Sequence, residues 1–409
     1  MERMIPVARR SSAPGIQRRW RQAWLAAIAL VLFGCEADRH QPAVPPELVE
    51  AARVPGIPGA RWWGDTPMPR RPTPLDAASY ERKAGDKRET GAPLRVLAIS
   101  GGGANGSFAA GLLNGWTQTG TRPAFDVVAG VSAGALAAPF AFLGPKYDEV
   151  LRELFEGTSA GDILTMRPRL VAFLGDSLAD PSPLRTLLGR HFTAALMKEI
   201  AAEHHGGRRL FIGTTNVFAS RFVIWDIGAI AASGRAGTLD LIHQVLLASS
   251  AVPILLPPVY LDVEAGGRRY SEMHMDGGMT RQVFVAPPGF DWAAAGRARN
   301  TNGRVEFYAI RNGRARPEYM TVPNSLIPLG EHAMHLLTLS EGIGDLYRLY
   351  VRAQQEHALF RAAWIDDTFA APWRQWYDPA YVRALFEQGR GQMLQGKAWH
   401  PLPPGLDAR

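Results

Sequence analysis

Short apolar runs alternate with longer amphipathic stretches through most of the chain after residue 93. The runs have the length and the flanking turn residues of strands, and the stretches between them have helical spacing. This alternation predicts an α/β fold in which helices cover both faces of a mainly parallel sheet. The expected strands are 95–99, 125–129, 209–214, 222–226, 259–263 and 305–310.

Two segments have helical rather than strand-like spacing. From 328 to 369 the apolar residues predict a pair of packing helices. From 139 to 202 the chain is helical and mixed, and its phenylalanines are expected in the core, with an apolar slot or lid for an acyl chain as the alternative. These phenylalanines are Phe140, Phe142, Phe155, Phe173 and Phe192.

Two glycine-rich turns follow the first two expected strands, and each precedes a helix-like stretch. The second turn, from Gly130 to Gly134, has the G-x-S-x-G spacing of a nucleophile elbow. In such an elbow a strained backbone projects the serine hydroxyl outward, and the glycines let neighbouring backbone pass closely. Ser132 is therefore the candidate nucleophile.

The first turn, from Ser100 to Gly106, is the candidate oxyanion hole. Its backbone N–H groups are suited to stabilising the negative charge of an acyl-transfer intermediate. The predicted donors are Gly101, Gly102, Gly103 and Ala104.

The same turn also satisfies the G-x-G-x-x-G spacing of a dinucleotide site. That site needs an acidic residue at the end of the second strand. Asp126 lies at the start of its strand instead, where its side chain is at the wrong end of the sheet. We therefore expect no nucleotide.

A base for the serine is sought downstream, where Asp276 is followed by Gly277 and Gly278. A carboxylate acts as a base when desolvation raises its pKa. The same tripeptide is also typical of a plain tight turn. A Ser–Asp–His arrangement is the other possibility. The candidate histidines are His274, which would share the face of Asp276 on a strand, His332 and His335.

Four blocks in this order make the chain resemble bacterial patatin-like phospholipases: 101–106, 130–134, 248–253 with 257–258, and 276–278. The resemblance covers 93–315 well and extends more loosely to 405. It implies a three-layer αβα fold and a Ser–Asp dyad without a catalytic histidine. Ser132 would be the nucleophile, Asp276 the base, the first block the oxyanion hole and the third block a structural support.

Two residues of the first block depart from the family pattern. Ser100 stands where the family has an aspartate, and Asn105 stands where it has arginine or lysine. Backbone oxyanion donors are unaffected by either change. An asparagine gives only a dipole where a cation would attract an anionic head group, so the departure bears on phospholipid preference more than on hydrolysis.

The first 35 residues have the pattern of an export signal. Six arginines precede an uncharged apolar run over 23–33, which is too short to span a membrane as a helix. Cys35 follows two residues after the run and resembles the acylated cysteine of a bacterial lipobox. Cys35 is the only cysteine, so the sequence allows no intrachain disulfide. Glu36 rather than aspartate follows it, which by resemblance to sorted lipoproteins favours an outer-membrane anchor facing the periplasm. A basic n-region is favoured over twin-arginine export.

The net charge is concentrated in this signal. Of the formal net charge of +7, +5 falls within residues 1–35, and the remaining 39 basic and 37 acidic residues give +2. We therefore expect no nucleic-acid partner. No Cys/His cluster has metal-ligand spacing, so we expect no metal and no cofactor.

Residues 36–92 are predicted to be a proline-rich tether, since nine prolines lie between Pro42 and Pro74. Within it, Trp62 and Trp63 are expected to dock on the domain surface. The domain itself is expected over 93–405, with 399–405 as a terminal strap.

Together these patterns predict an exported, lipid-anchored serine acyl hydrolase. Its substrate would be a phospholipid, a lysophospholipid or another fatty acyl ester, and Cys35 would attach it to the membrane. Two alternatives remain: a catalytically silent lipoprotein that binds lipid or a partner, and an esterase of small soluble esters.

Overall fold

The computed structural model describes residues 40–67, 91–298, 301–372 and 377–406. Residues Pro42–Arg409 form one compact unit with its own cores, so a chain that begins at residue 36 retains the whole of it. Cys35 and the predicted signal lie outside the described residues.

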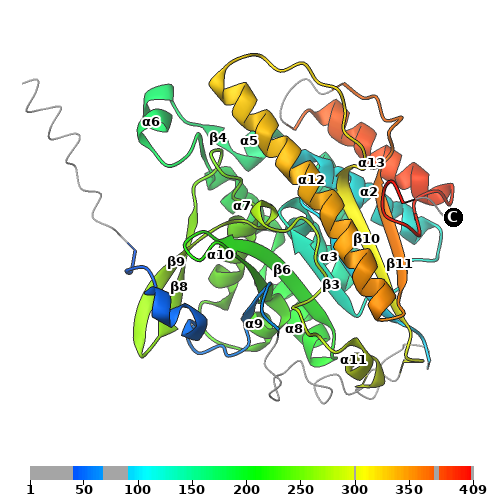
Figure 1. Ribbon diagram of the computed structural model, residues 1–409, viewed down its shortest axis with the longest axis horizontal. Helices are drawn as coiled ribbons and strands as arrows, with labels where there is room; N and C mark the ends of the chain where they lie inside the picture. Colours follow the sequence, from blue (N-terminus) through cyan, green and yellow to red (C-terminus); the bar gives the residue numbers. More distant parts are fainter. Residues whose placement is uncertain (1–39, 68–90, 299–300, 373–376, 407–409) are drawn as a thin grey trace, which may run out of the picture. The chain divides into compact units, whose positions relative to one another are not determined.

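A nine-stranded sheet runs through this unit, with the main order β1-β7-β6-β3-β2-β10-β11 (Figure 1). Neighbours from β6 to β11 are parallel, whereas β1 and β7 are antiparallel to their neighbours. β9 pairs antiparallel with β6 and carries β8. The strands are β1 (Arg61–Trp63), β2 (Leu94–Ile99), β3 (Val127–Val131), β6 (Arg209–Asn216), β7 (Arg221–Asp226), β8 (Val259–Ala265), β9 (Arg268–Asp276), β10 (Val305–Arg314) and β11 (Leu359–Ile365).

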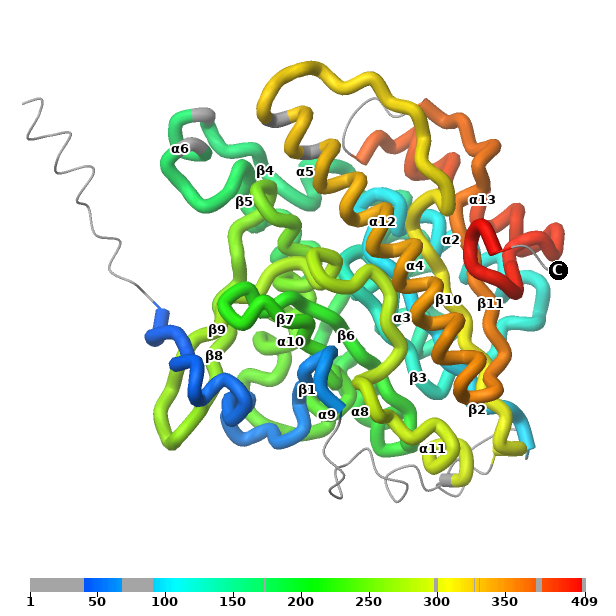
Figure 2. The backbone as a smooth tube through the Cα atoms, viewed as in Figure 1, coloured from blue at the N-terminus to red at the C-terminus, as the bar shows by residue number. Residues whose placement is uncertain are grey.

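Helices cover both faces of the sheet, as alternating side chains of β2 show. Leu97 and Ile99 pack into the core beneath α2 and α3, while Val96 and Ala98 pack into the core beneath α11 and α12. α2 and α13 lie side by side, and α12 crosses the other face (Figure 2). The predicted three-layer, mainly parallel α/β fold is thus confirmed. The main helices are α2 (Gly106–Gln118), α3 (Ala133–Leu143), α4 (Asp148–Glu156), α7 (Ser182–His191), α8 (Ala194–His205), α10 (Thr238–Ser249), α11 (Trp292–Ala298), α12 (Leu326–Gln355) and α13 (Pro379–Leu394).

All six expected strands are present, but the helix pair expected over 328–369 is wrong. The segment forms one long helix, α12, and then β11, which pairs parallel with β10. The helix ends near His357, whose φ of 50° is incompatible with a right-handed helix. The apolar residues after it are spaced for a strand that buries alternate side chains.

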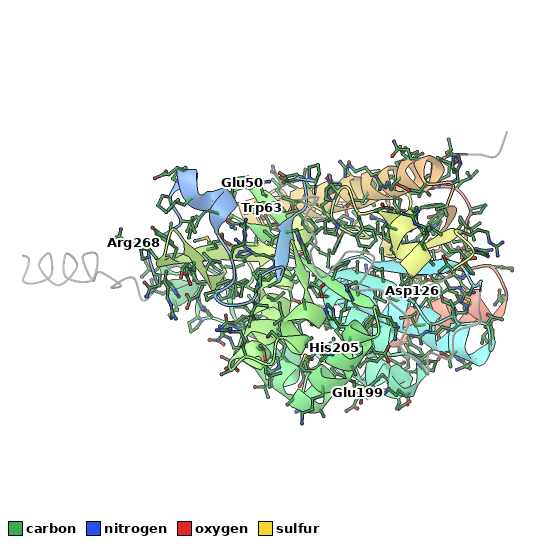
Figure 3. The ribbon with its side chains drawn as sticks, turned by 90° about the horizontal axis from the view of Figure 1, so that it is seen from below. Glu50, Trp63, Asp126, Glu199, His205 and Arg268 are labelled. Atoms are coloured by element: carbon green, nitrogen blue, oxygen red, sulfur yellow. The ribbon has the colours of Figure 1, made fainter. Side chains whose placement is uncertain are left out.

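The described part of the proline-rich segment packs on the domain. β1 extends the sheet beside β7, and Trp62 meets Phe211 edge to face at 6.1 Å. Arg221 lies over the ring of Trp63 and pairs with Glu50 at 2.5 Å. Figure 3 shows Glu50 and Trp63 close together. The expected docking of the tryptophans is confirmed, and residues 42–67 belong to the same compact unit as the domain instead of forming a free tether.

The end of the chain is held as a strap, as expected. Trp399 packs against Trp116 and Tyr308, with ring centroids 4.8 Å and 5.2 Å apart. His400 stacks on Trp364 at 4.0 Å and pairs its backbone with β11.

A buried ionic network joins β1 to β9. Arg61 donates two hydrogen bonds to the Glu272 carboxylate, one of 2.8 Å from Nη2 to Oε1. Glu272 also bonds His274 at 3.1 Å, and His274 bonds Thr214 at 2.9 Å. Burial alone would raise the pKa of Glu272, but the His274 and Arg61 contacts outweigh it and lower the pKa to about 2. Glu272 is therefore ionised and neutralises Arg61.

We predict that Glu272→Gln lowers the free energy of unfolding by about 3–5 kcal/mol, because it leaves the Arg61 guanidinium buried without a counter-charge. Urea unfolding followed by circular dichroism at pH 7 measures the change. Glu264→Gln, on the exposed face of β8, is the control. Equal losses in both variants would contradict this role for the network.

Candidate active site

Ser132 occupies a sharp turn between β3 and α3. Its backbone φ of 55° and ψ of −125° lie outside the regions that residues other than glycine ordinarily adopt. The residue is 7% exposed. A side chain at Gly130 would overlap the carbonyl oxygen of Gly134, and one at Gly134 would overlap that of Ile99. The two glycines therefore allow the close backbone packing that holds Ser132 in its strained conformation.

Asp276 ends β9, where antiparallel pairing with Thr214 of β6 brings it to the same edge of the sheet. Its carboxylate accepts a hydrogen bond at 2.7 Å from the backbone N–H of Gly278, and the neighbouring Ser132 hydroxyl favours its ionised form. Gly277 packs against the Gly213 backbone and Val131, so the chain can turn directly after the carboxylate. The structure thus brings the two predicted residues together at one edge of the sheet.

Burial controls the ionisation of Asp276, which is 5% exposed. Desolvation raises the pKa of its carboxyl group to about 6, although the interactions with Ser132 and with the Gly278 N–H lower it. A carboxylate with this pKa is ionised at neutral pH and is far more basic than an exposed aspartate. It is suited to accept a proton from the neighbouring Ser132 hydroxyl.

The third sequence block supports this pair from behind. The Ser249 hydroxyl, at the end of α10, accepts a hydrogen bond from the Ser132 backbone N–H at 2.9 Å and donates one to the Gly213 carbonyl at 2.7 Å. The carbonyl of Ala251 accepts the Asp276 backbone N–H at 3.0 Å. One segment therefore fixes the backbones of both residues.

The first glycine-rich turn lies against Ser132. A Cβ at Gly101 would be only 3.1 Å from Ser132 Cβ, and one at Gly102 would overlap the Asn312 carbonyl. No described residue accepts a hydrogen bond from the N–H of Gly102 or Gly103. Ala104 is buried in the short helical turn that follows. The turn thus presents uncommitted backbone donors beside the serine.

Asn312, at the end of β10, clamps this turn. Its backbone N–H donates to the Ser100 hydroxyl at 2.8 Å, and its Nδ2 donates to the Ser100 carbonyl at 2.8 Å. Ser100 in turn donates to the Gly101 carbonyl at 2.7 Å. Ser100 thus holds the turn with its hydroxyl where the family has an acid. Asn105 accepts a hydrogen bond from Tyr381 of α13 at 3.1 Å.

Gln282 links the glycine-rich turn to the Asp276 segment. Its side chain donates to the Gly278 carbonyl at 3.0 Å, and its Oε1 lies near the open side of Gly101. Its backbone N–H donates to Asp345 of α12 at 2.7 Å. Sequence reasoning missed Gln282, Asn312 and Asp345, since none has a motif of its own.

The sequence model of the Patatin-like phospholipase family matches residues 97–287, which include every residue of this site except Asn312, Asp345 and Tyr381. The chain carries a patatin-like phospholipase domain. Among solved structures it is similar to VipD from Legionella pneumophila, with 14% identity and a TM-score of 0.39, covering 75% of this chain and 67% of that one.

Two further structures resemble the patatin-like domain and its flanks. The type III effector ExoU of Pseudomonas aeruginosa is 14% identical with a TM-score of 0.25, covering 76% of this chain and 56% of ExoU. Human GIVD cytosolic phospholipase A2 is 10% identical with a TM-score of 0.26, covering 75% and 59%. The chain thus spans less than two thirds of either protein. A comparison with curated protein sequences gives no match.

The three candidate histidines are used elsewhere in the patatin-like domain and its flanks. His274 is fully buried between Glu272 and Thr214, although it shares the strand face of Asp276. His332 and His335 stack on each other on α12, with centroids 6.1 Å apart. Among the described contacts, none joins these rings to Ser132 or Asp276.

Asp126, weighed as a ribose ligand, directly precedes β3, at the end of the strand opposite Ser132. Its carboxylate accepts a hydrogen bond from the Arg95 backbone at 2.8 Å. It therefore lies away from the glycine-rich turn.

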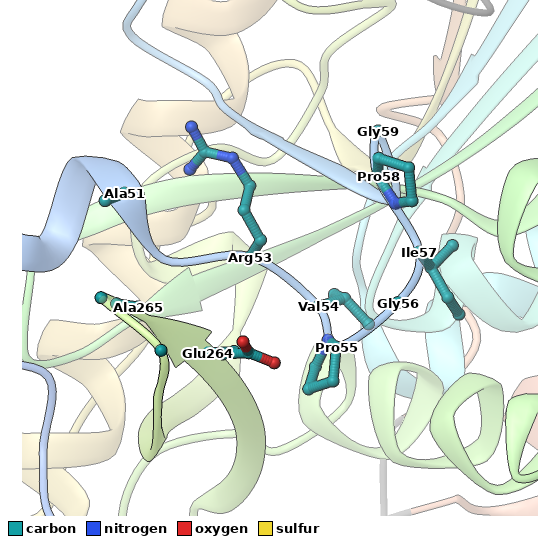
Figure 4. Close-up of a pocket in the computed structure, with 12 residues that line it drawn as sticks. Ala51, Arg53, Val54, Pro55, Gly56, Ile57, Pro58, Gly59, Glu264 and Ala265 are labelled. Atoms are coloured by element: carbon teal, nitrogen blue, oxygen red, sulfur yellow. The ribbon is translucent and has the colours of Figure 1, made fainter.

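A metal site and a surface pocket are the other candidates in the described ranges. No group of three or more His, Cys, Asp or Glu side chains there is placed to hold a metal ion. A shallow pocket lies between the N-terminal segment and the β8–β9 hairpin, with Arg53 and Glu264 at its wall (Figure 4). Its lining, 51–59 and 264–267, contains no residue of the Ser132 site.

The pKa of Asp276 predicts a pH dependence for the reactivity of Ser132. Because the carboxyl pKa is raised to about 6, the ionised form is lost as the pH falls through 6. We expect the rate of Ser132 phosphonylation by a fluorophosphonate to be about tenfold lower at pH 5 than at pH 7. Mass spectrometry of the Ser132 peptide measures this rate. A rate independent of pH over this range would contradict the assignment.

Proposed function

We propose that the patatin-like domain hydrolyses fatty acyl esters of phospholipids or lysophospholipids through a Ser132–Asp276 dyad. The observation that carries the proposal is the placement of the strained Ser132 beside a buried carboxylate whose pKa is raised to about 6. The family match supports a lipid acyl ester as the substrate.

In the proposed first step, Ser132 Oγ attacks the ester carbonyl carbon and its proton passes to the Asp276 carboxylate. The carbonyl oxygen becomes an oxyanion. Asp276 then returns the proton to the leaving alcohol oxygen as the ester bond breaks, which leaves an acyl ester on Ser132.

In the second step, water attacks the acyl carbon. Asp276 accepts a proton from this water and returns it to Ser132 Oγ as the fatty acid departs. The same carboxylate serves both steps, so the reaction requires no histidine.

The glycine-rich turn is proposed to stabilise the oxyanion. The N–H groups of Gly102 and Gly103 have no acceptor among the described residues, and the turn lies against Ser132 at Gly101. Preformed backbone donors need no reorganisation as charge develops, which is the source of their catalytic benefit. Because this function uses backbone groups, Asn105 does not impair it.

The same proposal places the domain at a membrane through a lipid on Cys35, on the periplasmic face of the outer membrane. The support is the basic, apolar and cysteine-ending pattern of the first 35 residues. Metabolic labelling with a palmitate analogue would test it: the label should be lost in Cys35→Ser. Label retained in that variant would rule out this anchor.

The dyad is tested by fluorophosphonate labelling of residues 36–409 together with release of fatty acid from phosphatidylcholine in mixed micelles. We expect one adduct on Ser132, no adduct there and no hydrolysis in Ser132→Ala, and both rates at least 100-fold lower in Asp276→Asn.

The matched control is Ser220→Ala, which changes an exposed serine whose φ is also positive, at 54°. It should keep the rates of the parent protein. Hydrolysis retained in Ser132→Ala would exclude the dyad. An unlabelled, inactive parent of native fold would favour a silent binding protein, and preference for acetyl over decanoyl esters would favour a small-ester esterase.

A further inference from the structure

The N-terminal half of α12 exposes apolar side chains on several sides. Leu326 is 87% and Leu337 65% exposed, and other exposed residues of this segment are Leu329 and Leu336. Among the side chains described from 326 to 341, none is buried, whereas Leu346 and Leu349 farther along the same helix lie in the core. An apolar helical segment that buries none of its described side chains is exceptional on a monomeric protein in water.

This half of α12 projects past the edge of the sheet that carries the site. Arg311, beside the clamp residue Asn312, donates a hydrogen bond to the Leu339 carbonyl at 3.1 Å. Leu339 therefore marks where the helix passes the carboxyl end of β10. Residues 326–338 precede that point and extend roughly 20 Å at 1.5 Å per residue. Figure 1 shows these first turns of α12 projecting above the strands.

A second apolar projection rises from the same edge. It is the excursion formed by β4 (Thr165–Met166), α6 (Arg169–Leu174) and β5 (Ala179–Asp180). Its exposed apolar side chains are Met166, Leu170, Val171 and Leu174.

This excursion is tied to the Asp276 segment. The N–H groups of Leu178 and Ala179 donate to the carbonyls of Ile254 and Leu255 at 2.8 Å and 2.9 Å, and the Ala251 carbonyl accepts the Asp276 N–H. Ile254 is itself 61% exposed and has a φ of 72°, a costly conformation for a β-branched residue. The apolar excursion is thus attached to the chain three residues from Ala251, which holds the Asp276 backbone.

Charge distinguishes the occupant of the α12 surface. Residues 319–340 contain a single charged side chain, Glu331, and no lysine or arginine occurs from 317 to 347. A protein interface is ringed by polar and charged residues that select the partner, whereas the acyl region of a bilayer selects against charge. Tyr319, which is 91% exposed, is a residue type enriched at the level of lipid head groups.

We propose that the N-terminal half of α12 and the 165–180 excursion together form a docking surface for a lipid bilayer. The surface inserts its leucines at the boundary between head groups and acyl chains and holds the sheet edge that bears Ser132 at the membrane. In the part of the chain that the structure describes, no helix is long and apolar enough to cross a membrane, which fits peripheral docking. This proposal rests on the proposed function for the identity of the lipid substrate, whereas the docking surface itself is inferred from the exposed apolar side chains.

The test is flotation of residues 36–409 with phosphatidylcholine vesicles in 0.1 M and 1 M NaCl. This chain lacks Cys35 and the apolar run before it. The parent should float at both salt concentrations, because insertion of uncharged leucines is not screened by salt. Leu326→Asp/Leu337→Asp and Leu170→Asp/Leu174→Asp should each lower the vesicle partition coefficient at least tenfold.

The matched control is Val351→Asp. Val351 is 52% exposed on the same helix, but near the opposite edge of the sheet, where Leu359 pairs with Glu306 at the start of β10. It should float within twofold of the parent. Hydrolysis of a soluble acetyl ester and the thermal unfolding midpoint should be unchanged in every surface variant, which shows that each is folded.

Three outcomes would overturn the docking surface. They are a parent that stays with the aqueous fraction, aspartate variants that float as the parent does, and a parent dimer in sedimentation that Leu326→Asp/Leu337→Asp dissociates, since a second copy would then be the occupant. Failure of the proposed function gives a different result: vesicles are bound, and the leucine variants lose binding, but no ester is cleaved. Ser132→Ala should float as the parent does.

Discussion

The pairing of Ser132 with the desolvated carboxylate of Asp276 is the interaction around which the rest of the site is arranged. Raising an aspartate pKa from 3.8 to about 6 costs about 3 kcal/mol at neutral pH, because each pKa unit corresponds to about 1.4 kcal/mol. The strained backbone of Ser132 adds to this cost. Neither residue would keep its position unless its surroundings determined it from several directions.

The order and direction of the strands determine the positions of both residues. The parallel strands bring the turns after β2 and β3 to one edge of the sheet, where ligands commonly bind in α/β folds. Asp276 reaches that edge differently, at the end of an antiparallel strand paired with β6. The end of α10 then fixes both backbones through Ser249 and Ala251, and the Arg61–Glu272 pair anchors β9 from behind.

Much of this arrangement could be predicted from sequence because it depends on local rules. The strand–glycine–helix pattern around Ser132 is encoded within a few residues, and the strand expected over 259–263 is present as β8, Val259–Ala265. The prediction of a helix pair over 328–369 failed because the apolar residues of this segment satisfy helical spacing. Only the pairing with β10 shows that 359–365 is a strand. Asn312 and Gln282 could not be found from the sequence, because no spacing rule connects them to their partners. Asn312 contacts Ser100, which is 212 positions away, and Gln282 contacts Gly278, which is four positions away.

The central claim is that acyl transfer passes through Ser132. The most direct measurement is acid quenching of residues 36–409 during turnover of phosphatidylcholine with a deuterated acyl chain, followed by mass spectrometry of the Ser132 peptide. The account predicts a deuterated acyl ester on this peptide that is absent in Ser132→Ala. Release of deuterated fatty acid without any acyl peptide, at a rate that Ser132→Ala retains, would contradict it.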